Sequence, residues 1–128
     1  MRTALSLCLL AATAAAQDPA RNPKLHIAFV GNAGSERAED FRKFLAQQYG
    51  EVQVVDRKTC DPKALQGADV VLLDWSQQED GVIGWMNDPK AVKRCPLGER
   101  SAWHKPTVLL GDAGLNVAAV WDVAGGYG

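Results

Sequence analysis

Four short apolar runs recur along the chain, separated by polar segments with helical spacing or turn residues. The runs lie at 24–30, 51–55, 68–73 and 107–110. Most of their positions are apolar in succession rather than in alternation, which is typical of strands buried on both faces of a parallel sheet. Strands that alternate with helical segments predict βαβ units, whose right-handed crossovers place helices on both faces. We therefore predict an open parallel α/β sheet of about four strands.

The polar segment after the first run has the spacing of an amphipathic helix. Ser35 predicts the N-cap, and apolar residues then recur every three or four positions as far as Gly50, which predicts the stop. Asp61 followed by Pro62 predicts the start of a short helical turn. Shorter helical segments are expected at 61–67, 88–94 and 115–120.

The amino-terminal segment has the pattern of a cleavable signal peptide. Arg2 is the positive residue, 4–12 is the apolar stretch, and three alanines ending at Ala16 form the cleavage site. The apolar stretch is too short to span a bilayer, so we expect no stable membrane insertion after cleavage. These features predict a signal peptide at 1–16, a tether at 17–23, an α/β domain at 24–128, and a secreted or periplasmic location.

The carboxyl-terminal segment lacks the further strand and helix with which such a domain normally closes. Its last residues are mainly glycine, and they end at Gly128. Either the sheet stops at four strands or the reading frame has ended early, and we favour the second interpretation. The DNA beyond Gly128 would distinguish them, because an early stop leaves strand-like coding sequence downstream.

Two cysteines remain in the predicted mature chain, Cys60 and Cys95. In an oxidising compartment, two cysteines indicate one disulfide in the first instance. The alternative is two separate thiols with a redox role, but the chain has no CxxC spacing to favour it.

Charge and histidine content limit the classes of partner. The formal net charge is −1 and the isoelectric point is near 6.1, so the chain lacks the basic surplus that nucleic-acid binding requires. The two histidines, His26 and His104, are expected to be structural, and we predict neither a metal nor another cofactor. The sequence leaves the oligomeric state open.

The candidate binding site lies where the predicted strands end. Ligands of open parallel sheets bind outside the carboxyl ends of the strands, near the point where the strand order reverses. The loop at 31–35 lacks the spacing of a dinucleotide or P-loop motif, and its glycines also suit an ordinary tight turn. The polar and aromatic residues at these ends are Asn32, Gly34, Ser35, Asp74, Trp75 and Asp112.

Two of these positions have alternative interpretations. Asp74 and Asp112 would form an acid–base or cation site if their strands are neighbours, although aspartate is also common there as a cap or turn residue. Trp75 would stack on a sugar or another planar ligand, but packing beneath the third crossover is the favoured interpretation.

Three stretches, at 24–45, 68–75 and 105–114, together resemble secreted proteins of the ThuA-like, class I glutamine amidotransferase-like superfamily. The resemblance implies a flavodoxin-like sheet. Catalytic members carry a cysteine in a G-x-C-x-G elbow, whereas the nearest segment here, 111–114, has no cysteine and is one residue short. The resemblance therefore implies a protein without amidotransferase activity, and it suggests a link to carbohydrate utilisation.

These observations favour an exported, non-catalytic domain that binds a small polar ligand such as a carbohydrate. The second hypothesis is an enzyme, either a hydrolase that uses Asp74 and Asp112 or a thiol oxidoreductase completed by further carboxyl-terminal sequence. A third is a structural or partner-binding module, which a large exposed apolar patch would indicate.

Overall fold

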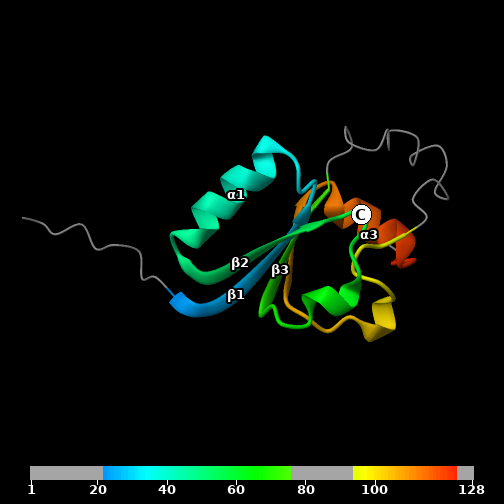
Figure 1. Ribbon diagram of the computed structural model, residues 1–128. Coiled ribbons are helices and arrows are strands. Elements are labelled where there is room, and N and C mark those ends of the chain that lie inside the picture. Colours follow the sequence, from blue (N-terminus) through cyan, green and yellow to red (C-terminus); the bar gives the residue numbers. More distant parts are fainter. Residues whose placement is uncertain (1–21, 76–93, 124–128) are drawn as a thin grey trace, which may run out of the picture.

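The computed structural model describes residues 22–75 and 94–123, and within them the chain forms one four-stranded sheet (Figure 1). The order of the strands is β2-β1-β3-β4, and all three neighbouring pairs run parallel. The predicted open parallel α/β sheet is therefore confirmed. Its strands are β1 (Asn22–Gly31), β2 (Tyr49–Asp56), β3 (Val70–Trp75) and β4 (Thr107–Gly111).

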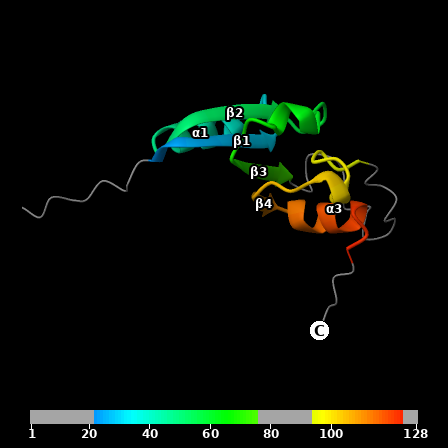
Figure 2. The same cartoon turned by 90° about the horizontal axis from the view of Figure 1, so that it is seen from below.

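Helical elements cover both faces of the sheet, as predicted (Figures 1 and 2). Helix α1 (Glu36–Ala46) connects β1 to β2 and packs against these two strands. The opposite face carries the 3-10 turn η1 (Pro62–Leu65) and helix α3 (Ala113–Val120), which follows β4. A further 3-10 turn, η4 (Arg100–Ala102), precedes β4.

The larger core cluster lies on the face covered by η1 and α3. Leu73 of β3 and Leu65 of η1 are completely buried there, and Val117 of α3 packs on the same cluster. On the α1 face, Phe29 is completely buried and stacks on Phe41 of α1, with ring centroids 5.0 Å apart. Burial on both faces explains why the central strands β1 and β3 are apolar almost throughout, whereas the edge strands β2 and β4 keep exposed side chains.

Helix α1 begins where the sequence predicts and ends earlier. The Ser35 hydroxyl accepts a hydrogen bond from the Ala38 amide at 3.1 Å, so the predicted N-cap is confirmed. The expected stop at Gly50 is wrong, because the helix ends at Ala46 and Gly50 already belongs to β2. Phe44, a member of the predicted apolar stripe, is 60% exposed because α1 is packed against β1 and β2 through other residues of the stripe.

The predicted tether and the first strand overlap. β1 begins at Asn22, whose amide donates to the Gln48 carbonyl, so the last two tether residues are part of the strand. Pro23 has no amide hydrogen to donate, and the register with β2 shifts between Asn22 and His26. The signal peptide, the rest of the tether and most of the predicted helix at 88–94 lie outside the described residues. Within the described ranges, no helix has both the length and the apolar character needed to cross a membrane.

Candidate functional site

The strand order reverses between β1 and β3, so the predicted binding edge is at the centre of the sheet. From β1 the chain first builds β2 on one side, then returns to build β3 and β4 on the other. The ends of the two central strands are close together, because a Cβ added to Gly31 would lie 3.4 Å from the Cβ of Asp74. Of the predicted site residues, Asn32, Gly34 and Ser35 follow β1, and Asp74 and Trp75 are the last two residues of β3. Asp112 follows β4, one strand further out.

The loop after β1 is organised around Ser35. Its amide and its hydroxyl both donate to the Asn32 carbonyl, at 3.0 and 2.7 Å, and its hydroxyl also caps α1. Ser35 therefore has a structural role within the loop. Asn32 and Gly34 are exposed at the edge.

Two glycine positions at this edge differ in whether the backbone tolerates another residue. Gly111 has φ of 62°, and an added Cβ would lie 3.3 Å from the Trp75 carbonyl oxygen, whereas at Gly34 the nearest atom is 4.0 Å away. Gly111→Ala should therefore lower the free energy of unfolding by about 1–2 kcal/mol, because an L-residue is strained in the left-handed region. Gly34→Ala is the matched control and should change it by less than about 0.5 kcal/mol. Urea denaturation measures both, and equal effects would contradict the assigned turn geometry.

Asp74 lies beneath the edge and is held by an arginine that the sequence analysis did not select. Its side chain is only 6% exposed, and both of its oxygens accept hydrogen bonds from the Arg37 guanidinium, at 2.8 and 3.1 Å. The Arg37 side chain is about half exposed. Bidentate pairs of this kind fix the orientation of both groups. Asp74 is therefore a partner of Arg37 and not an isolated carboxylate.

An aromatic stack extends from the core to this ion pair. Phe41 lies between Phe29 of β1 and Arg37, and its ring centroid is 5.0 Å from both the Phe29 ring and the Arg37 guanidinium carbon. The face of the Phe41 ring attracts the Arg37 guanidinium, and Phe29 holds Phe41 in place. The stack therefore positions Arg37 over the sheet edge. The sequence offers one indication of this role. Arg37 lies two residues after the predicted cap Ser35, in the first turn of α1, which is the end of the helix that adjoins the sheet edge.

Trp75 is buried rather than presented to a ligand. It is 4% exposed, belongs to the core cluster, and lies beneath the Arg57 guanidinium at 4.8 Å from the ring centroid. These contacts favour the packing interpretation of Trp75 over sugar stacking. Arg57 follows β2, and its amide donates to the Gly31 carbonyl at 2.7 Å, so the carboxyl end of β2 adjoins the same edge.

The turn between β4 and α3 consists of Gly111 and Asp112. Its left-handed position, where a nucleophile elbow would carry the nucleophile, is a glycine. Gly111 has the left-handed conformation there and has no side chain. Asp112 occupies the N-cap position of α3 without making a side-chain capping bond. Its amide donates to the Trp75 carbonyl, which aligns the ends of β3 and β4.

Cys60 and Cys95 are both buried thiols in the same core cluster, and no disulfide joins them in this structure. Arg94, the residue before Cys95, links the two cysteine segments, because its guanidinium donates to the carbonyls of Cys60 and Lys58. Burial raises the pKa of both thiols, and the nearby Cys60 also raises the pKa of Cys95. A raised pKa lowers the thiolate fraction at neutral pH, which makes either residue a poor nucleophile.

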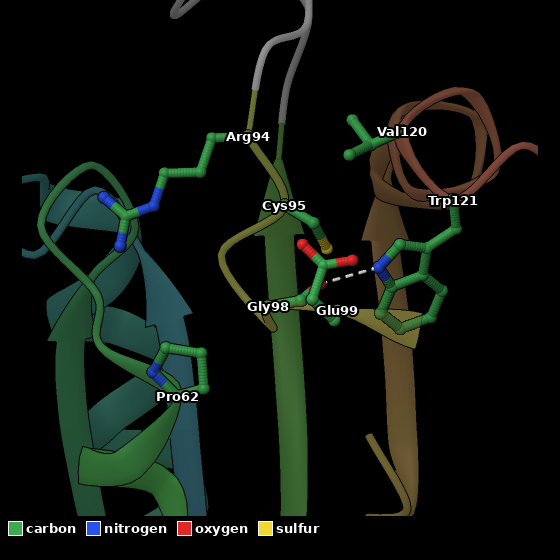
Figure 3. Close-up of a pocket in the computed structure, with 7 residues that line it drawn as sticks. All are labelled: Pro62, Arg94, Cys95, Gly98, Glu99, Val120 and Trp121. Carbon is green, nitrogen blue, oxygen red and sulfur yellow. Dashed lines mark hydrogen bonds between the residues drawn. The ribbon is translucent and has the colours of Figure 1, made fainter. Parts of the chain in front are cut away.

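A cavity of about 260 Å³ lies beside Cys95 on the face covered by α3 (Figure 3). Trp121 forms one wall, and its indole donates to the Gly98 carbonyl at 2.8 Å. Figure 3 shows Arg94 extending away from Trp121, toward the loop after β2, where its donors contact backbone carbonyls. The indole of Trp121 and the guanidinium of Arg94 therefore hold neighbouring segments of the chain together, and Glu99 adds a carboxylate to the cavity lining.

The described ranges contain no group of three or more histidine, cysteine or acidic side chains placed to hold a metal ion. His26 is in β1, where its amide donates to Asp69 at 2.8 Å and its ring lies 3.5 Å from a Glu51 oxygen. The structure brings polar groups together at the ends of β1 and β3, where Arg37 pairs with Asp74, and also around the cavity beside Cys95. Comparisons with protein-family models, curated proteins and solved structures found no match to this chain.

Proposed function

We propose that the domain is an exported, non-catalytic binding protein that holds a small neutral polar ligand, such as a carbohydrate, at the carboxyl ends of β1 and β3. The observation that carries this proposal is the Arg37–Asp74 pair at the strand-order reversal, next to the exposed residue Asn32. Open α/β sheets bind ligands at this position.

The charges at this edge favour a neutral ligand over an anion. Arg37 is compensated by Asp74, and the first turn of α1 adds the carboxylate of Glu36, whereas Glu39 is paired with Arg42 and Lys43. Acidic side chains at a helix N-terminus oppose the attraction that its dipole exerts on anions. The exposed amide of Asn32 and the half-exposed guanidinium of Arg37 supply donors and an acceptor of the kind that sugar hydroxyls require.

The same geometry weighs against the enzymatic alternatives. Both oxygens of Asp74 are engaged by Arg37, so Asp74 is poorly suited to exchange protons with a substrate. The raised pKa values of Cys60 and Cys95 oppose a thiolate mechanism.

Export is proposed from the amino-terminal pattern, and sequencing the amino terminus of the secreted protein tests it.

Calorimetric titration with a panel of neutral mono- and disaccharides tests the binding proposal. We expect at least one sugar to bind, and Asn32→Ala to weaken that binding about tenfold, which corresponds to roughly 1.4 kcal/mol. Gln47→Ala is a matched control, because Gln47 is exposed at the other end of α1. Binding that Asn32→Ala leaves unchanged, or no binding across the panel, would contradict the proposal.

A further inference from the structure

The cavity beside Cys95 lies between parts of the chain that are far apart in the sequence. Pro62 of η1 forms one side, Trp121 after α3 forms the other, and the segment before η4 adds Gly98 and Glu99 (Figure 3). Figure 3 shows these residues in front of β3, on the side of α3 that faces η1. A strand added at the outer edge of the sheet, beyond β4, would therefore leave the cavity open.

The shape of this cavity is fixed by two close contacts. Gly98 has φ of 81°, and an added Cβ would lie 2.9 Å from Cγ of Pro62, so a side chain at this position would push η1 away. The Trp121 indole donates to the Gly98 carbonyl at 2.8 Å, which sets the orientation of the ring. Val120 adds an apolar surface that packs against the core cluster. The walls are therefore built from packed groups, and the volume of about 260 Å³ suits a small molecule.

Glu99 brings a carboxylate without a partner to this cavity. Glu99 is exposed, and within residues 22–75 and 94–123 its carboxylate makes neither an ion pair nor a side-chain hydrogen bond. Arg94 also lines the cavity, but its guanidinium donates to two backbone carbonyls after β2 and, in Figure 3, extends away from Glu99. The Cys95 thiol stays neutral at neutral pH, because burial, and after it the neighbouring Cys60 and Glu99, raise its pKa. The carboxylate therefore lies next to Gly98, to which the indole ring is bonded, with its charge available to a ligand.

This combination of groups favours a cation over an anion or a neutral ligand. A carboxylate forms its strongest hydrogen bonds with charged donors, and tryptophan is the side chain whose ring attracts a cation most strongly. Glu99 would repel an anion. An ammonium group held by Glu99 beside Trp121 leaves Pro62 and Val120 to cover an apolar chain.

We propose that this cavity binds a small organic cation, a protonated primary amine on a short apolar chain, with its ammonium between Glu99 and Trp121. The site is separate from the sheet edge proposed for the neutral ligand. Asp74 meets Arg37 of α1 on one face of the sheet, whereas the cavity lies on the face covered by η1 and α3. The two proposals can therefore fail independently.

Titration with butylammonium chloride at neutral pH and constant ionic strength tests this site, with butanol as the uncharged probe of the same chain length. In the isotope-labelled protein we expect the indole N–H signal of Trp121, identified by its loss in Trp121→Phe, to shift furthest. Butylammonium should bind at least about tenfold more tightly than butanol, because only the cation gains the charged hydrogen bond and the attraction of the ring. Equal affinities for the two probes, or no shift with butylammonium up to roughly 50 mM, would overturn the proposal.

Glu99→Gln separates the effect of the carboxylate from that of the cavity shape. It should weaken butylammonium binding about tenfold, to the level of butanol, and leave butanol binding unchanged. Glu36→Gln is the matched control, because Glu36 is also exposed but lies on α1, across the sheet, and it should affect neither probe. Circular dichroism confirms that each variant is folded. Butylammonium binding that Glu99→Gln leaves unchanged would also overturn the proposal.

Discussion

Replacing Cys60 with serine should lower the free energy of unfolding of the oxidised protein by about 3–4 kcal/mol. This expectation requires Cys60 and Cys95 to be joined after export, as the sequence predicts for an oxidising compartment. Both thiols lie in one buried cluster, and Arg94, the neighbour of Cys95, donates to the Cys60 carbonyl. Bond formation would transfer two electrons and two protons from the thiols to a disulfide-bearing oxidant.

Urea denaturation of the oxidised and reduced proteins isolates the contribution of the bond. Cys60→Ser should be much less stable than the oxidised wild type and somewhat less stable than the reduced wild type, because it loses the same cross-link and also buries a hydroxyl in the core. A free-thiol count in denaturant, on protein recovered from an oxidising compartment, establishes the oxidation state of the two cysteines. Two titratable thiols in freshly exported, denatured protein would contradict the disulfide.

Phe29→Ala should destabilise the fold by about 3–5 kcal/mol, because it empties a completely buried aromatic site. Phe29 supports Phe41, and Phe41 in turn supports the Arg37 guanidinium at the sheet edge. The substitution should therefore also loosen the Arg37–Asp74 pair, although neither residue is changed.

Phe44→Ala is the matched control for this substitution. Phe44 lies on the same helix as Phe41 but is 60% exposed, so its loss should cost less than about 0.5 kcal/mol. Thermal or urea denaturation compares the two variants. Similar losses for Phe29→Ala and Phe44→Ala would show that α1 does not pack on β1 as described.

The parallel sheet could be predicted because strands buried on both faces need continuous apolar runs. The same rule placed strand boundaries less well, since hydrogen bonding extends past apolar residues: β3 continues through Asp74, whose carboxylate is paired with Arg37. Glycine favours helix ends, which predicts a helix stop at Gly50, yet Gly50 lies in β2. Local preference is a weak guide where tertiary hydrogen bonds determine the boundary.

The candidate site could be located in part. Parallel strands bring their ends to one edge, so Asn32 and Asp74 could be assigned to the same region from the sequence. The contribution of Arg37 could not, because an arginine on an amphipathic helix usually faces solvent and only the fold places it over β3. Burial of Trp75 beneath Arg57 likewise depends on β2 ending beside the central strands.

The central claim is that a neutral polar ligand binds where β1 and β3 end, and amide chemical-shift mapping tests it most directly. Titrating the isotope-labelled protein with the sugar that binds best should shift the amides of Asn32 to Arg37 and of Asp74 first and furthest. Shifts centred instead on the cavity beside Trp121, or spread evenly over the sheet, would contradict the claim.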